Sequence, residues 1–336
     1  MTGHQKRTLL VVIGFAISII LLIFLFRNIK PGELATALKE ANYWWLLPNI
    51  LMVMFGMYQR AYRWRAMLDP IKRVSYSNLL AATCIGFMAN NVLPLRLGEF
   101  VRAYSLSRQD PEISKSASLA SIFVERMVFD LVALLLIFGV IISYSNLAVH
   151  EEMKDGVLVA VGIALVGIVF MLLLALMPAQ SGTIISKTLF FMPDRIKGTV
   201  QQLVAKFSRG LEFIRDPAKL TSVAIQTIIL WLFMGFSNWF VFRAFGFDLP
   251  LTASFVLLVV VSVSILIPSS PGFVGVYHVG TVWTLTNYNI PRAEALSFAL
   301  VLHAAQYIPI TVMGFYYLKK EHLSLKKLEE EASVAE

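Results

Sequence analysis

Three charged residues interrupt an otherwise apolar stretch in the first half of the sequence. They are Glu125, Arg126 and Asp130, within the segment ERMVFD. A charge at the centre of a bilayer costs on the order of 2.5–3.5 kcal/mol to insert, so such side chains face protein or water rather than lipid. Arg126 and Asp130 are four residues apart and share a helical face, which predicts an ion pair between them.

Glu125 has no oppositely charged partner at helical spacing. A carboxylate inside the membrane must accept hydrogen bonds from a donor group or take up a proton. We therefore expect Glu125 to point inward, either as the counter-charge of Arg96 or Arg102 or as a protonatable group. The alternative is that the three charges only hold neighbouring helices together.

A second set of candidate residues surrounds two interruptions of apolar segments. The segments read NNVLPLRLGEFVRAY and SILIPSSPGFVGVYH, and are called here the first break and the second break. Placing Pro94 over Pro268 brings Gly98 over Gly272, so both segments share the pattern Pro-x-x-x-Gly. Such a pair in the two halves of a chain is typical of a transporter whose binding site lies near the middle of the membrane. The alternative is a kink in each of two ordinary spans, because Pro and Gly are frequent in transmembrane helices.

The helices that follow the breaks favour an anion. A helix that begins near Leu97 or Gly272 leaves its first N–H groups without intrahelical partners and carries a partial positive charge at that end. Arg96 and Arg102 flank the first break, and a guanidinium can hold two phosphate oxygens. The alternatives are that Arg102 reaches the membrane surface and that Arg96 pairs with Glu99.

These patterns predict a polar cavity shared by the two breaks, which holds the phosphate of a lipid. The predicted substrate-binding residues are Asn90, Asn91, Arg96, Glu99, Arg102, Glu125, Ser269, Ser270 and Gly272. The residues predicted to shape the breaks or support the helices are Pro94, Gly98, Arg126, Asp130, Pro268, Pro271 and Gly275.

No metal and no cofactor are expected. His278 and His303 lie in apolar context without a second ligand at suitable spacing, and are interpreted as packing residues. Cys84 is the single cysteine, which excludes an intrachain disulfide and a CxxC site.

The elements that must position these residues are membrane helices. Of the 336 residues, 57% are hydrophobic and 15% are charged, with a mean hydropathy of +0.71, whereas soluble domains carry about 25% charged residues. Basic residues lie between apolar runs rather than on one soluble face, which argues against nucleic-acid binding. Runs without Asp, Glu, Lys or Arg cover 8–26, 41–59, 74–95, 131–150, 156–186, 220–242, 249–291 and 295–318.

The breaks divide two of these runs into helical hairpins, at about 78–107 and about 253–286. Their arms reach only about 16–24 Å, short of a bilayer core of about 30 Å. Three full spans separate the hairpins, so the two hairpins open to opposite sides. We therefore expect an all-α polytopic membrane protein with six full spans and two inverted hairpins, in one domain over 1–336.

The basic residues orient the chain. Lys and Arg are concentrated in the loops on the side of the N-terminus, which predicts that both termini are cytoplasmic, in a prokaryotic cytoplasmic membrane. The first apolar run lacks a small-residue cleavage site and is interpreted as a retained helix. Residues 196–215 have an amphipathic helical period, which fits a helix on the inner leaflet or a linker.

The chain resembles the flippase-like membrane family typified by the transmembrane domain of lysylphosphatidylglycerol synthases. The resemblance rests on NNVLPLRLGEFVRAY, ERMVFD and PSSPGFVGVYH, and implies an inverted-repeat, lipid-translocating fold. It also implies that Asn90, Arg96, Glu99, Arg102, Glu125 and Arg126 occupy matching polar positions. Many members have Gly where Phe273 stands and a carboxylate where His278 stands, so we do not carry over a coupling mechanism through the second hairpin.

We therefore predict a lipid transporter or flippase that works by alternating access. Its substrate is a phosphate-bearing lipid, such as a phospholipid, an aminoacylated phospholipid or a polyprenyl-phosphate-linked glycan, whose tails remain in the lipid bilayer. The synthases' soluble aminoacyl-transfer domain has no counterpart in these 336 residues, so lipid synthesis is not expected. The alternatives are an intramembrane enzyme on a lipid phosphate, for which no catalytic constellation is found, and an accessory subunit that binds a lipid-modifying enzyme.

Overall fold

The computed structural model describes residues 3–27, 29–144, 209–325 and 327–328, with residues 162, 166 and 169 besides. Within these ranges the regular elements are helices and none is a strand. The predicted all-α class is therefore confirmed. The predicted span at 156–186 and most of the predicted amphipathic helix at 196–215 lie outside the described residues.

The first half of the bundle contains one helix pair interrupted by the first break. Its elements are α1 (Gly3–Phe26), α2 (Pro31–Glu40), η1 (Tyr43–Trp45), α3 (Leu46–Leu68), α4 (Tyr76–Val92), η2 (Pro94–Arg96), α5 (Gly98–Gln109), α6 (Lys115–Val124), η3 (Glu125–Asp130) and α7 (Leu131–Tyr144).

The second half repeats this order around the second break. Its elements are η4 (Glu212–Arg215), α11 (Pro217–Ala244), α12 (Leu251–Ser264), η5 (Pro271–Phe273), α13 (Val276–Asn287) and α14 (Arg292–Lys320).

Three described helices are long and apolar enough to cross a membrane, at Thr8–Phe26, Pro217–Ala244 and Arg292–Lys320. Large apolar side chains on α1 are exposed over most of its length, among them Ile20 and Ile23 at 64% and 63%. An exposed apolar surface of this extent is stable in lipid rather than in water. The chain is therefore an integral membrane protein.

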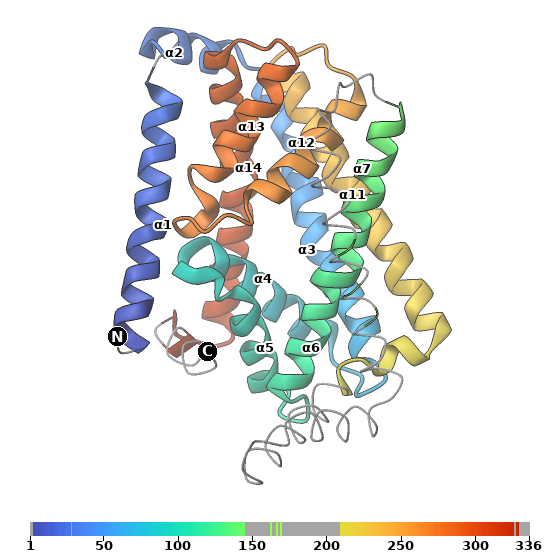
Figure 1. The fold of residues 1–336 in the computed structure, drawn as a ribbon. Coiled ribbons are helices and arrows are strands. Elements are labelled where there is room, and N and C mark those ends of the chain that lie inside the picture. Colours follow the sequence, from blue (N-terminus) through green and yellow to red (C-terminus); the bar gives the residue numbers. More distant parts are fainter. Residues whose placement is uncertain are drawn as a thin grey trace.

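The two hairpins approach each other from opposite ends of the bundle (Figure 1). The α4–α5 hairpin occupies the lower half of the view and the α12–α13 hairpin the upper half, and their breaks meet between the two ends. The start of α1 and the end of α14 lie at the same end of the bundle. The described helices thus show the inverted relation expected of the hairpins.

The two breaks have the same backbone course, but in a different register from the one predicted. Each contains a short turn with two consecutive left-handed residues, Leu95 and Arg96 in the first and Gly272 and Phe273 in the second. Both turns begin with a proline, so the structural equivalent of Pro94 is Pro271.

The helices around the breaks confirm this register. Gly98 begins α5, and Gly275 stands directly before α13. The pairs Pro94 with Pro271, Gly98 with Gly275 and Lys115 with Arg292 are separated by the same number of residues. The alignment of Pro94 with Pro268 was therefore wrong, because Pro-x-x-x-Gly occurs twice in PSSPGFVG and the first occurrence precedes the turn.

A helix cap and a lysine in the adjoining loop stabilise the end of the first hairpin at which α4 begins and α5 ends. Ser75 Oγ accepts from Asn78 N at 3.2 Å at the start of α4. In the adjoining loop Lys72 Nζ donates to Asp110 Oδ1 at 2.7 Å and lies 2.8 Å from Glu112 Oε1. The hydrogen bonds to Asp110 and Glu112 raise the pKa of Lys72 above its ordinary value. These contacts tie the loop after α3 to the loop after α5.

The arms of the first hairpin approach closely at two glycines. A Cβ on Gly86 would lie 2.6 Å from Arg102 Cβ and 2.8 Å from Gly98 O. A Cβ on Gly98 would overlap the carbonyl oxygen of Gly86 and the side chain of Asn90. The small residues thus let α5 lie directly against α4, as in other membrane helix pairs.

We expect Gly98→Ala to destabilise the protein by about 1–3 kcal/mol, because backbone atoms of α4 cannot move aside as a flexible side chain would. The midpoint of thermal unfolding in detergent micelles should fall. Gly139→Ala on α7 is the matched control, since nothing lies within 4 Å of its added Cβ. An equal or smaller effect at Gly98 than at Gly139 would contradict this packing.

Candidate functional site

A π-helical turn, η3, brings two carboxylates into the interior of the bundle. Glu125 and Asp130 are its first and last residues, with exposed fractions of 0% and 4%. In an α-helix residues five apart point about 140° away from each other. The wider π turn brings them toward one side, and such turns are frequent at functional sites. Both carboxylates face the same arginine on α3.

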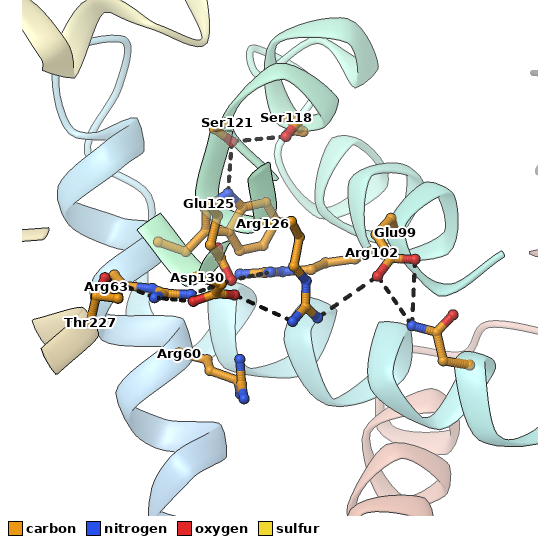
Figure 2. Close-up of polar contacts among 12 residues, drawn as sticks. Arg60, Arg63, Glu99, Arg102, Ser118, Ser121, Glu125, Arg126, Asp130 and Thr227 are labelled. Atoms are coloured by element: carbon orange, nitrogen blue, oxygen red, sulfur yellow. Dashed lines mark hydrogen bonds and ion pairs between the residues drawn. The ribbon is translucent and has the colours of Figure 1, made fainter. Parts of the chain in front are cut away.

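That arginine is Arg63, whose side chain is fully buried. Its Nη2 lies 2.9 Å from Glu125 Oε1, and its Nη1 lies 2.8 Å from Asp130 Oδ1. Nη1 also donates to Thr227 Oγ1 on α11 at 2.9 Å. Trp231, also on α11, donates its indole N–H to Asp130 Oδ1 at 3.1 Å. Arg63 therefore joins α3, η3 and α11 (Figure 2).

Arg102 on α5 binds the same glutamate. Its Nη1 donates to Glu125 Oε1 at 3.1 Å, and its guanidinium lies 4.0 Å from the ring centroid of Trp64. Trp64 in turn donates to Ser121 Oγ at 2.9 Å. The expectation that Glu125 points toward Arg102 is confirmed. The alternative in which Arg102 reaches the membrane surface is wrong, because its exposed fraction is 2%.

Arg126 connects this cluster to the first break. Its guanidinium lies 3.4 Å from Asp130 Oδ2, as the spacing predicts, and 3.7 Å from Glu99 Oε1. Asn90 Nδ2 donates to Glu99 at 3.3 Å, and Asn90 Oδ1 accepts from Gly98 N at 2.8 Å. The first N–H group of α5, predicted to face an anion, is therefore capped by Asn90.

These contacts form one connected set, called here the charge network. Its members are Arg63, Glu99, Arg102, Glu125, Arg126 and Asp130. Glu99 and Arg126 are its partly exposed members, with side-chain exposures of 33% and 26%. The network therefore reaches from the buried Arg63 to an accessible end beside the first break.

A second group of residues, called here the tip contact, joins the two breaks. Arg96 lies over the ring of Phe273, with its Cζ 4.8 Å from the centroid. Tyr307 on α14 donates to Asn91 O at 3.2 Å and lies against Gly272. The alternative, a pairing of Arg96 with Glu99, is not among the ion pairs of the described residues, because Arg96 faces the second break.

The remaining predicted residues secure the second break to α1 and α14. Ser270 N donates to Ser18 Oγ at 2.9 Å, and Ser18 Oγ lies within hydrogen-bond distance of Val274 O and Ser270 Oγ. Ser269 lies beside Gly14 of α1, away from the charge network. His303 donates to Gly272 O at 2.9 Å. These serines serve helix packing, whereas the polar cavity expected between the breaks stays a prediction.

Sequence reasoning missed Arg60 and Arg63. Both stand in the basic segment RAYRWR, which counts among the basic loops used above to orient the chain. They lie instead within α3, with exposed fractions of 4% and 0%. Their three-residue spacing on one helical face was the available signal. The partners of Arg63 are contributed by η3 and α11, which are distant from it in sequence.

Comparison with known proteins identifies relatives of the whole described bundle. A model of the lysylphosphatidylglycerol synthase TM region matches residues 11–314. Glycosyltransferase AglD of Haloferax volcanii is 24% identical over 97% of this chain and 57% of that protein. The chain thus spans little more than half of this relative.

Two similar proteins are called UPF0104 membrane proteins. The one from Methanocaldococcus jannaschii is 24% identical over 71% of this chain and 98% of its own length. One from Methanothermobacter thermautotrophicus is 23% identical over 89% of this chain and 90% of its own length.

Arg63→Gln should destabilise the protein by about 3–5 kcal/mol, because two buried carboxylates lose the one cation that they share. Arg65→Gln on the same helix is the control, since its side chain is 42% exposed and we expect a change within about 0.5 kcal/mol. Thermal unfolding in detergent measures both. Similar unfolding midpoints for the two variants would show that Arg63 does not hold the network.

Arg102 and Glu125 should be energetically coupled. The double variant Arg102→Gln, Glu125→Gln is expected to lose about 0.5–3 kcal/mol less unfolding free energy than the sum of the losses in the two single variants. The reason is that each single change removes one partner of the remaining charge, whereas the double change removes both charges. A double-mutant cycle by thermal unfolding gives this value. Arg102→Gln combined with Arg65→Gln should be additive, and additivity in both cycles would argue against the ion pair.

Proposed function

Because the chain belongs to the family of the lysylphosphatidylglycerol synthase transmembrane region, we propose that it is a lipid transporter. It binds the phosphate-bearing head group of a lipid and moves it between the two leaflets while the tails remain in the bilayer. The observation that carries this proposal is the tip contact. Two inverted hairpins with arms too short to span the membrane meet there, with Arg96 of the first over the ring of Phe273 of the second and Tyr307 of α14 bonded to Asn91.

The two hairpins are held in different ways, which supports a moving part and a fixed part. The first is fixed by the charge network and by close packing of α4 against α5 and α14. The second break has no Asp, Glu, Lys or Arg, and hydrogen bonds between uncharged groups, at Ser18, Tyr277 and His303, hold it and the start of α13. We propose that the second hairpin moves relative to the first, and that this movement opens the site alternately to each side.

The topology proposed for this mechanism has six full spans, two inverted hairpins and cytoplasmic termini. It is supported by the position of the start of α1 and the end of α14 at one end of the bundle and by the basic loops there. The archaeal relatives favour a prokaryotic cytoplasmic membrane. Cysteine labelling from either side of sealed vesicles tests this orientation.

The name of the Haloferax relative, a glycosyltransferase, favours a second candidate function connected with glycosyl transfer. In that case the protein would be an accessory subunit of a lipid-modifying enzyme, with no transport of its own. Reconstitution distinguishes the candidates. Translocation of a labelled lipid by the purified protein alone supports the transporter, whereas stimulation of a partner enzyme without translocation supports the accessory subunit.

The transport assay uses fluorescent phosphatidylglycerol in proteoliposomes and a membrane-impermeant quencher. We expect protein-dependent quenching of inner-leaflet lipid, and slower translocation of a neutral glycosyl diacylglycerol. Absence of protein-dependent translocation for both lipids would reject the proposed function.

Gly272→Ala should slow translocation markedly, because its Cβ would lie 2.6 Å from Tyr307 Cε2 and disturb the tip contact. Gly246→Ala is a matched control. Both glycines are left-handed, with φ of +71° and +66°, but nothing lies within 4 Å of a Cβ on Gly246. Both variants therefore bear backbone strain of about 1–3 kcal/mol, and equal transport rates would show that the tip contact is not needed.

A further inference from the structure

Arg60 is a buried cation without a carboxylate partner. It lies on α3, one turn before Arg63, and its exposed fraction is 4%. Its Nη2 contacts Met234 Sδ at 3.1 Å, a weak acceptor, while Nε and Nη1 have no hydrogen-bond partner. No ion pair to Arg60 occurs among the described residues. A buried guanidinium in this state is costly unless a ligand supplies the missing acceptors.

The charge balance around Arg60 calls for one anion. The charge network contains three arginines and three carboxylates, so its members compensate one another. Arg60 adds a fourth cation beside them. Among these described side chains, one positive charge is therefore left over, at the position where the unpaired donors lie.

Arg60 and Arg126 share an aromatic neighbour, which defines where the anion would lie. Their Cζ atoms are 4.8 and 4.9 Å from the ring centroid of Phe87 on α4. Arg126 also has a buried Nε without a partner. The Arg126 side chain is 26% exposed, so one of the two cations is partly accessible.

We propose that Arg60 and Arg126, beside Phe87, form the binding site for the phosphodiester of a lipid head group. A phosphodiester carries one negative charge, which matches the one charge of Arg60 that the charge network leaves uncompensated. Its oxygens can accept from Nε and Nη1 of Arg60 and from Nε of Arg126. The inference rests on the proposed lipid-transport function and specifies the group by which the substrate is held.

The source of the phosphate is a lipid rather than a soluble ion. Phe87 and Met234 are apolar neighbours contributed by the helices α4 and α11, and the site lies within the helical bundle rather than in a loop. A free phosphate would have to lose its hydration there without gaining burial of an apolar tail. Arg102, predicted from the sequence to hold the phosphate, already binds Glu125.

Lipid binding to the purified full chain tests the site. We expect phosphatidylglycerol to raise the midpoint of thermal unfolding in neutral detergent, and glycosyl diacylglycerol to leave it unchanged. Arg60→Met should lose at least about tenfold in affinity for phosphatidylglycerol, the equivalent of one charge-assisted hydrogen bond. Arg60→Lys should retain part of this affinity, and Arg65→Gln all of it.

A second readout separates loss of binding from loss of folding. Without lipid, Arg60→Met should unfold at a higher temperature than the wild type, because the variant no longer buries an unpaired charge. A folded Arg60→Met variant that binds phosphatidylglycerol with wild-type affinity would overturn the proposal. A much lower unfolding midpoint without lipid would also overturn it, because Arg60 would then be a structural residue with a partner inside the protein.

Binding of three other ligands tests whether the site recognises a lipid, an anion and a phosphodiester. Inorganic phosphate that produces the same shift as phosphatidylglycerol would overturn the assignment to a lipid. Equal binding of glycosyl diacylglycerol would overturn the anion site. At pH 8.5 phosphatidic acid carries close to two charges, and tighter Arg60-dependent binding of this lipid than of phosphatidylglycerol would overturn the preference for a phosphodiester.

The transport assay keeps this proposal distinct from the proposed function. Arg60-dependent binding without translocation would retain the site and reject the transporter. Translocation by Arg60→Met with wild-type lipid affinity would retain the transporter and reject the site.

Discussion

The pairing of Arg63 with Glu125 and Asp130 is the interaction on which the rest of the structure depends. Three charges inside a membrane bundle are stable only if they satisfy one another, because neither water nor lipid compensates them there. Their contacts join α3, η3 and α11 and, through Arg102, α5. The π turn is what brings both carboxylates to one guanidinium. The first hairpin is thereby held in a fixed position inside the bundle.

A fixed first hairpin gives the two halves different tasks. Their backbones are similar enough that Arg96 and Phe273, at equivalent places in the two turns, contact each other. Their side chains are not similar, since the position equivalent to Arg126 is His303 and the second break is uncharged. In the proposed mechanism the first half would supply the charges that recognise a head group, and the second half, whose break is uncharged, would be the part that moves.

The proposed phosphate site follows from the same charge balance. Once Arg63, Arg102 and Arg126 are paired with three carboxylates, Arg60 is the cation that remains beside them. The position of the site therefore depends on which pairs form, rather than on which basic residues lie near a break. This is why the flanking position of Arg102 in the sequence suggested a ligand role, whereas its partner in the fold is Glu125.

The sequence alone determined the membrane class, the broken hairpins and the buried cluster around Glu125, because the cost of placing charge, proline or glycine in a bilayer depends on local composition. It also predicted a contact of Glu125 with Arg96 or Arg102, of which the structure forms the second. Only the tertiary structure decided the register of the second break, where two Pro-x-x-x-Gly patterns overlap and the backbone turns at Pro271. It also decided that Arg63 meets two carboxylates and Arg60 none, because a π turn and contacts between helices distant in sequence determine which charges meet.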